Sequence, residues 1–247
     1  MCATCGCSDD AGVRVNGHGL EHGHGHGHQD RLVVLERKVL ARNDELAERN
    51  RAWLAARDVV AVNLMSSPGS GKTTLLERTI REVGGAVSVV EGDQETDFDA
   101  ERVRATGAPV VQVNTGAGCH LDADMLARAL HTLDPRAGSL VFVENVGNLV
   151  CPALFDLGER ARVVVMSVTE GADKPLKYPH MFRTADVVLL NKTDLLPYVD
   201  FDATTFGHAM NEVNPEAEIL TVSATRGDGL TDWYAWLSFA GSARRTT

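Results

Sequence analysis

Residues 66–73, with the sequence SSPGSGKT, have the composition of a phosphate-binding loop. Phosphate oxygens need several N–H groups at close range, and a glycine-bearing loop that enters a helix N-terminus supplies them, together with a favourable helix dipole. The usual pattern begins with glycine, and Ser66 occupies that position here. The alternative to a phosphate-binding loop is a turn that contains Gly-Lys-Thr by chance. The apolar run before the loop and the amphipathic stretch after it favour a nucleotide site. We predict that this site contains Pro68, Gly69, Ser70, Gly71, Lys72, Thr73 and Thr74, with Lys72 on the β- and γ-phosphates and the Thr73 hydroxyl on Mg²⁺.

The tetrapeptide NKTD at residues 191–194 predicts that the nucleotide carries guanine. Asp194 can accept hydrogen bonds from the ring N–H and the exocyclic amine of guanine, whereas adenine offers neither donor there. Asn191 would support the edge of the ring and the Lys192 stem would cover its face. The segment VSAT follows the next apolar run, where a backbone N–H at Ser223 or Ala224 can reach the base oxygen. Together with the phosphate loop, these features favour GTP over ATP.

The segment ENVGN at residues 144–148 closes another apolar run and is predicted to meet the terminal phosphate. Glu144 can hold Mg²⁺ or its water, and the Gly147 N–H can approach the γ-phosphate. Asp93, in EGDQETD, is placed for the metal side of the nucleotide, with an ordinary strand-end turn residue as the alternative. Segments that touch the γ-phosphate change their order on hydrolysis, so we expect a switch here.

Cys119, His120 and Cys151 are candidate ligands for a transition metal. A small buried apolar role is the alternative for each thiol taken alone. However, Cys119 lies in a Gly-rich loop beside His120, and both thiols follow strands of the predicted sheet, at the edge where parallel sheets place ligands. Thiolate and imidazole suit Zn²⁺ and Ni²⁺, and a second copy of the chain can supply the missing ligands. Because Cys151 is close in sequence to Gly147, we expect the GTP state to change the metal geometry.

The first 29 residues contain three further thiols, at Cys2, Cys5 and Cys7, and a run HGHGHGHQD with histidines at alternate positions. This segment has few apolar side chains, so we expect it to be disordered without a ligand. With no export signal, the cysteines should stay reduced and serve as metal ligands, catalytic thiols or core residues. An engineered tag is the alternative for the histidines, although alternating glycine is unlike one.

The elements that must position these residues are seven short β-branched runs that alternate with helical stretches. Continuous apolar strands separated by helices predict a P-loop NTPase fold of the α/β class: a mostly parallel seven-stranded sheet with helices on both faces. Residues 30–57 predict a preceding helix, capped by Asp30, with an apolar stripe of Leu32, Leu35, Val39, Leu46, Trp53 and Leu54. The expected division is a metal-binding tail at 1–29, this helix at 30–57 and a GTPase domain at 58–247.

The composition narrows the function classes further. The 247 residues carry a formal net charge of −10 and a pI of about 5.3, which argues against a nucleic acid as partner. No run approaches the roughly 18 apolar residues of a membrane span, and no signal peptide is visible. We therefore expect a cytoplasmic protein with no membrane partner.

The motifs taken together resemble the HypB family of nickel-incorporation GTPases in [NiFe]-hydrogenase maturation. The resemblance covers nearly the whole chain and rests on the segments CATCGC, SSPGSGKTTLL, EGDQETD, GCHLDADM, ENVGNLVCPA, DKPLKYPHMF and NKTDLLPYV. It implies a tight nickel site at Cys2, Cys5 and Cys7, and a weaker internal site for Zn²⁺ or Ni²⁺ at Cys119, His120 and Cys151. Metal binding can supply the folding energy that the N-terminal segment lacks, and backbone nitrogens can complete a square-planar Ni²⁺ site.

The resemblance also implies partners: a GTP-dependent homodimer, a HypA-type nickel chaperone and the hydrogenase large-subunit precursor. The short histidine run departs from family members that store nickel, so a modest buffering or loading role is expected of it. Three alternatives remain open at this point: a urease-type nickel GTPase, a nickel storage or buffering protein, and a small-molecule kinase that uses the phosphate loop.

Overall fold

The computed structural model describes residues 26–93, 98–116 and 118–242. The expectations for Cys2, Cys5 and Cys7 and for the rest of the tail up to residue 25 lie outside these residues. Seven strands form one sheet in the order β3-β2-β4-β1-β5-β6-β7, and every paired neighbour is parallel. The strands are β1 (Val60–Ser66), β2 (Val87–Asp93), β3 (Val110–Asn114), β4 (Leu140–Glu144), β5 (Ala161–Ser167), β6 (Val187–Asn191) and β7 (Glu218–Thr221).

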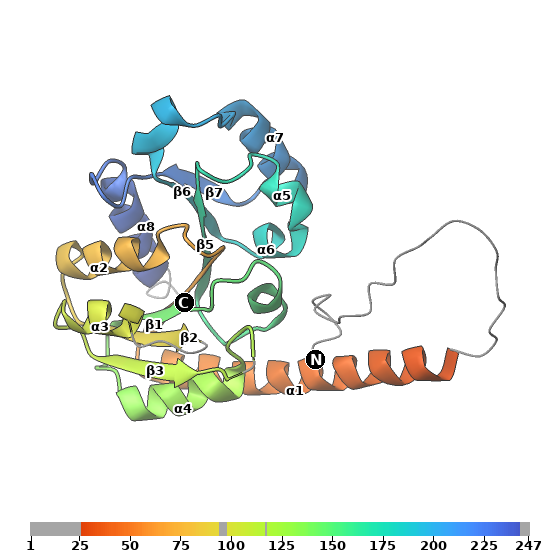
Figure 1. The fold of residues 1–247 in the computed structure, drawn as a ribbon. Coiled ribbons are helices and arrows are strands. Elements are labelled where there is room, and N and C mark those ends of the chain that lie inside the picture. Colours follow the sequence, from red (N-terminus) through yellow and green to blue (C-terminus); the bar gives the residue numbers. More distant parts are fainter. Residues whose placement is uncertain (1–25, 94–97, 117, 243–247) are drawn as a thin grey trace, which may run out of the picture.

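Helices cover both faces of the sheet, as the continuous apolar strands predict (Figure 1). Alternate residues of a strand point to opposite faces of the sheet. Val62 and Leu64 of β1 therefore pack in the hydrophobic cluster on one face, and Ala61 packs in a cluster on the other. The first face is covered by α2 (Lys72–Glu82), α3 (Phe98–Arg104) and α8 (Leu230–Ser242). The second face is covered by α1 (His26–Ala56), α4 (Ala123–Leu133), α6 (Pro179–Arg183) and α7 (Ala203–Val213).

Four short elements interrupt the simple alternation of strands and helices. They are the 3₁₀ helices η1 (Cys151–Leu154) and η2 (Thr193–Tyr198), the single-turn helix α5 (Lys174–Lys177), and α6. Prolines occupy the first or second position of η1, α5 and α6, where the missing N–H costs nothing and the fixed φ suits a helix. None of these short elements has enough residues to show helical periodicity in the sequence.

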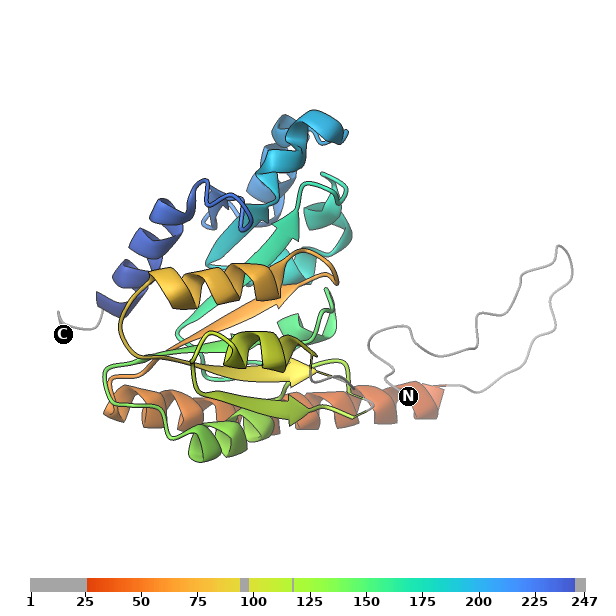
Figure 2. The same ribbon diagram turned by 60° about the vertical axis from the view of Figure 1, so that its left-hand side comes forward.

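The long N-terminal helix α1 differs from the prediction in its start and in its buried face. It begins at His26, so Asp30 lies inside the helix and does not cap it. The buried positions are Asn43, Ala47, Asn50 and Leu54, which follow one helical face, while Val39 of the predicted apolar stripe is 49% exposed. At 1.5 Å per residue the helix is about 46 Å long, and its N-terminal part extends beyond the sheet (Figure 2).

The carboxyl ends of all seven strands share one edge of the sheet, because all of them are parallel. The loops that leave this edge carry the predicted functional residues: the phosphate loop after β1, Cys119 and His120 after β3, and the segment from Glu144 to Cys151 after β4. Within the described residues, none of the helices has both the length and the apolar character needed to span a membrane.

Candidate nucleotide and metal site

The phosphate loop connects the central strand β1 to the N-terminus of α2. Ser66 is the last residue of β1 and is buried, so the chain leaves the sheet only after it. Gly69 and Gly71 have φ values of 74° and 92°, in the region that favours glycine, and a Cβ at Gly71 would lie 2.6 Å from Asn191 Nδ2. Gly71 is the N-cap of α2 and offers no side-chain cap, which leaves the first N–H groups of the helix to a ligand.

The polar side chains of this loop fit a phosphate ligand. Ser70 is 1% exposed, and its Oγ has no hydrogen-bond partner within the described residues. A buried hydroxyl without a partner costs free energy, and a phosphate oxygen would remove that cost. Thr74, in the first turn of α2, accepts a hydrogen bond from Arg102 at 3.1 Å through its hydroxyl, so its backbone N–H is the group that can serve the nucleotide.

Glu144 at the end of β4 joins the two residues predicted to hold the phosphates and the metal. Its Oε1 accepts hydrogen bonds from Lys72 Nζ and Thr73 Oγ1, each at 2.7 Å. The carboxylate side chain is 2% exposed, and its Oε2 has no partner within the described residues. A buried carboxylate oxygen beside a threonine hydroxyl is the donor set that Mg²⁺ prefers, so these residues fit that ion. Asp93 is the last residue of β2. It lies two residues after Glu91, which pairs with Glu144 in the sheet.

The residues predicted to read the base gather at the ends of β6 and β7. Asn191 is 1% exposed and its amide bridges two loops, since Nδ2 donates to Ser70 O at 2.9 Å and Oδ1 accepts from Ala224 N at 3.0 Å. Lys192 adopts φ 61° and donates to Gly69 O at 2.6 Å. Ser223 Oγ donates to Asp194 Oδ1 at 2.6 Å, which orients the carboxylate. Asn191 thus ties the phosphate loop to the segment that carries the other base-binding candidates.

Cys119, His120 and Cys151 form a cluster at the opposite end of the same sheet edge. Their ligand atoms all lie within 4.8 Å of one another, with 3.7 Å between Cys119 Sγ and His120 Nδ1. Cys151 is 2% exposed, while the other two are partly exposed. Burial lowers the pKa of the His120 imidazole, and the charge of Asp122 opposes this in part. The neutral imidazole, which is the form that binds metals, is therefore favoured, and the two sulfurs complete a soft donor set.

A single stretch of chain, from Glu144 to Cys151, connects the predicted phosphate-binding residues to the candidate metal ligands. A Cβ at Gly147 would lie 3.4 Å from the Pro68 Cα and N atoms, so this segment runs against the phosphate loop. Asn148 Oδ1 accepts from the N–H groups of Val150 and Cys151, at 2.7 and 3.3 Å, and Nδ2 contacts Cys151 Sγ at 3.7 Å. The cysteine is therefore held by a residue only one position away from the phosphate-loop contact.

The segment from Glu144 to Cys151 also contacts the loop that carries Cys119 and His120. Asn145 Oδ1 accepts from the backbone N–H of Leu121 at 3.2 Å, and Leu121 directly follows His120. The Leu121 side chain also packs over Gly92, where a Cβ would lie 2.7 Å from it. The loop that carries Cys119 and His120 thus contacts the ends of both β4 and β2.

Several residues of this region were not identified from the sequence. Glu170 accepts hydrogen bonds from Ser67 of the phosphate loop, from the Ser167 N–H at 2.9 Å and from Lys174 at 2.7 Å. Phe155 stacks on His120 with ring centroids 3.9 Å apart and an interplanar angle of 20°. The asparagines of ENVGN were a visible signal, because polar residues at the end of a buried strand need partners. No sequence pattern indicates that Glu170 contacts Ser67 or that Phe155 stacks on His120.

Comparisons with known proteins identify the family of this chain. Residues 60–221 match the family model described as "CobW/HypB/UreG, nucleotide-binding domain". The chain is 55% identical over 218 residues to the hydrogenase maturation factor HypB of Azotobacter chroococcum, covering 87% of this chain and 72% of that protein. It is 57% identical over 211 residues to HypB of Escherichia coli K12, covering 85% and 73% respectively.

A solved structure has the same fold. It is HypB from Helicobacter pylori, described as a complex with nickel, which aligns with a TM-score of 0.78 at 36% identity and covers 82% of this chain and 96% of that one. The family model covers residues 60–221, and the two relatives are more than 50% identical to this chain over more than two thirds of their own length. This chain belongs to the HypB family of hydrogenase maturation factors.

Proposed function

We propose that this protein is a GTP-hydrolysing nickel metallochaperone that inserts Ni²⁺ into the large-subunit precursor of a [NiFe]-hydrogenase. Membership of the HypB family supports a role in hydrogenase maturation. The Asp194 carboxylate, held by Ser223, supports guanine as the base. The cluster of two thiols and an imidazole supports a soft or borderline metal as the cargo.

One observation carries the coupling of these activities: the chain from Glu144 to Cys151 contacts the phosphate loop and carries a metal-ligand candidate. Glu144 accepts hydrogen bonds from Lys72 and Thr73. Gly147 lies against Pro68 of the phosphate loop. Cys151 lies four residues farther on. A change at the γ-phosphate therefore has a short covalent route to the metal cluster.

The chemistry begins with GTP lying over the phosphate loop. The α2 N-terminus and Lys72 would bind the phosphate oxygens, and Asp194 would hold guanine. Thr73, Glu144 and Asp93 would hold Mg²⁺, whose charge would stabilise the negative charge that develops on the β- and γ-oxygens. Water attacks the γ-phosphorus, the bond from that phosphorus to the β–γ bridging oxygen breaks, and GDP and phosphate form.

Loss of the γ-phosphate would remove the hydrogen-bond acceptor of the Gly147 N–H. The segment from Glu144 to Cys151 would then relax, and Cys151 would move relative to Cys119 and His120. A site of two thiolates and one imidazole tolerates little displacement, because its few ligands hold the ion only when all converge. Ni²⁺, or Zn²⁺ in its place, would be bound differently before and after hydrolysis.

The protein would work as part of a larger assembly. A GTP-dependent homodimer would supply further ligands to an internal site that has three per chain. The tail at 1–29, through Cys2, Cys5 and Cys7, would hold a second nickel ion, and the domain at 58–247 would act as the GTPase. A HypA-type nickel chaperone would deliver or receive the ion.

The test follows radioactive nickel from the loaded protein to a purified large-subunit precursor, with a HypA-type chaperone present. We expect transfer to require GTP and to stop with a non-hydrolysable analogue, because release depends on loss of the γ-phosphate. The Lys72→Ala variant serves as the control for hydrolysis. Equal transfer with GTP, with the analogue and with no nucleotide would contradict the proposal and favour passive buffering.

A further inference from the structure

The buried face of α1 contains two asparagines where apolar side chains are usual. Asn43 and Asn50 are each 5% exposed, and they flank Ala47, which is fully buried. A buried amide is costly unless its donor and acceptor groups are paired. Both side chains find partners on other parts of the chain, far away in sequence.

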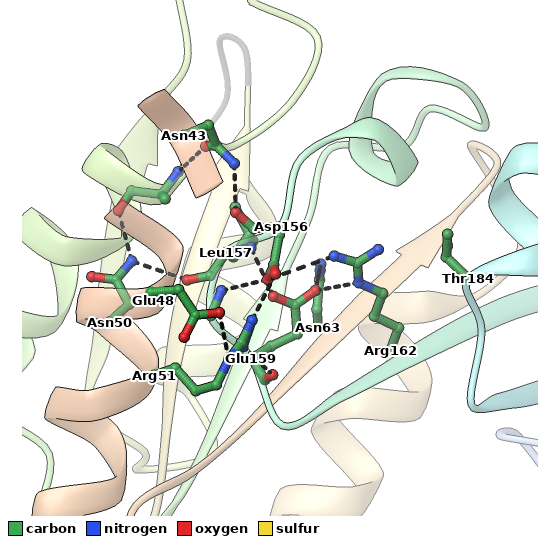
Figure 3. Close-up of polar contacts among 12 residues, drawn as sticks. Asn43, Glu48, Asn50, Arg51, Asn63, Asp156, Leu157, Glu159, Arg162 and Thr184 are labelled. Atoms are coloured by element: carbon green, nitrogen blue, oxygen red, sulfur yellow. Dashed lines mark hydrogen bonds and ion pairs between the residues drawn. The ribbon is translucent and has the colours of Figure 1, made fainter. Parts of the chain in front are cut away.

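The two asparagines bridge the same pair of segments (Figure 3). Asn43 accepts from the Ala123 N–H at 2.9 Å and donates to the Asp156 carbonyl at 2.7 Å. Asn50 donates to the Ala123 carbonyl at 2.8 Å and to the Leu157 carbonyl at 2.9 Å. Together they hold the start of α4 against the loop at 156–157 and hold both against α1.

These two segments are the ones that lead to the metal cluster. Ala123 lies three residues after His120, and Asp156 lies five residues after Cys151. Between them the Phe155 ring stacks on the His120 imidazole at 3.9 Å. The distance between the imidazole and the Cys151 thiol thus depends on how the two segments are held together.

Further contacts hold the loop around residues 156–158 against α1. Arg51 Nη2 contacts Asp156 Oδ2 at 2.6 Å, and the Gly158 N–H donates to Asp156 Oδ1 at 2.8 Å. A Cβ at Gly158 would lie 2.3 Å from the Ala47 carbonyl, at a φ of 85°. The loop therefore has little freedom to move while α1 stays docked.

We propose that Asn43 and Asn50 are positioning residues for the Cys119–His120–Cys151 metal site, so that the docked α1 sets the spacing of ligands that it does not itself provide. This inference rests on the proposed metal role of that cluster. Neither asparagine touches a ligand. Their effect passes through Ala123 to His120, and through the loop at 156–157 to Cys151. Residues that hydrogen-bond directly to metal ligands commonly change affinity by about 10- to 100-fold when removed, so we expect an effect near the lower end of this range for residues one step farther away.

The test uses the full chain with Cys2, Cys5 and Cys7 changed to Ser, so that Cys119 and Cys151 are its only thiols. Ni²⁺ is added against a competing chelator, and thiolate-to-nickel charge-transfer absorption is followed, because imidazole groups of the histidine run do not contribute to it. We expect Asn43→Ala and Asn50→Ala to weaken nickel binding at the thiols by about tenfold or more and to alter the charge-transfer spectrum.

The matched control is Thr79→Val, on the opposite face of the sheet. Thr79 is buried and accepts a hydrogen bond from Trp233 Nε1 at 3.0 Å, so its loss also removes a buried hydrogen bond. Melting temperatures are measured for all variants, and Asn43→Ser and Asn50→Ser, whose hydroxyls are too short to reach both segments, replace any alanine variant that fails to fold. Nickel affinity should not change in Thr79→Val despite a similar loss of stability.

Two outcomes would overturn the inference, and they differ. If the parent chain shows charge transfer and the asparagine variants match it, or fall no further than Thr79→Val, the positioning role is wrong while the metal site stands. If the parent chain itself shows no thiolate-to-nickel absorption, the metal assignment of Cys119, His120 and Cys151 fails, and the inference fails with it.

Discussion

At the scale of single residues, the site depends on the buried carboxylate of Glu144, which binds Lys72 and is also a predicted ligand of Mg²⁺. Glu144 accepts from both Lys72 and Thr73 through one oxygen, while its other oxygen is buried without a partner within the described residues. The ion pair with Lys72 offsets part of the cost of burying this side chain, which is 2% exposed. The same lysine is therefore expected to serve both the carboxylate and the phosphates.

Replacing Lys72 by alanine should lower the rate of GTP hydrolysis by about a hundredfold or more, because the positive charge that stabilises the developing phosphate charge is lost. Steady-state phosphate release measures the rate, and circular dichroism confirms folding. Lys177→Ala is the matched control, since Lys177 pairs with Asp173 and its side chain is 62% exposed. Hydrolysis at the original rate in Lys72→Ala would rule out the assigned site.

Base recognition gives a second residue-scale prediction. Asp194→Asn should weaken GTP binding by about tenfold or more, because the amide that replaces one oxygen faces guanine donors with another donor. Xanthosine triphosphate, which has a carbonyl in place of the guanine amine, should gain affinity. Competition binding of the two nucleotides to the parent chain and the variant measures the shift. An unchanged preference would show that Asp194 does not read the base.

At the scale of elements, the sequence predicts the sheet well and the short helices poorly. Seven apolar runs were predicted and seven strands form. The prediction succeeded because central strands such as β1 and β6 are buried along their whole length and must be unbroken apolar runs. The four short elements were missed because each has only four to six residues, too few for a helical period. On α1 the predicted stripe was partly wrong, because it was chosen from apolar residues alone, whereas the buried face includes Asn43 and Asn50 and leaves Val39 exposed.

Docking of α1 should depend on pH through Asp156. Burial acts to raise the pKa of this carboxyl, but the Gly158 N–H and the Arg51 guanidinium outweigh burial and lower it. A lowered pKa in the folded state means that stability is present above the unfolded pKa, about 3.8, and is lost as the pH falls through the folded value.

Arg51→Met, which keeps the apolar stem, should therefore lower the free energy of unfolding at pH 7 by about 1 kcal/mol or less. The difference from the parent chain should shrink as the pH falls below about 4. Urea unfolding between pH 3 and 7 measures it. Arg57→Met serves as the control, because Arg57 pairs at the surface with Asp134. A difference that stays constant across this range would show that the Asp156 contact does not contribute.

At the scale of the whole molecule, residue types suggested that Cys119, His120 and Cys151 act together, and the sheet topology explains why the three lie close to one another. The thiols follow β3 and β4, which lie on either side of β2, and their loops meet because all the strands end at one edge. The residues that support the cluster, such as Phe155 and Asn145, could not be predicted, since their contacts come from distant parts of the chain. The nucleotide-binding domain was predictable because the motifs that indicate it are local in sequence.

The two proposed metal sites should be separable across the molecule. Changing Cys2, Cys5 and Cys7 together to Ser should remove the tightest nickel site and leave GTP hydrolysis within about twofold of the parent rate, because the phosphate loop and its partners all lie between residues 66 and 224. Nickel titration and phosphate release on the same preparation test both halves. A large loss of hydrolysis would show that the tail is part of the GTPase.

The most direct test of the coupling is the nickel affinity of this same triple variant, measured once with GDP and once with a non-hydrolysable GTP analogue. We predict Ni²⁺ dissociation constants that differ by about fivefold or more, with the metal changing nucleotide affinity by the same factor. Identical nickel affinities in the two nucleotide states, together with identical nucleotide affinities with and without nickel, would contradict a delivery mechanism driven by GTP hydrolysis.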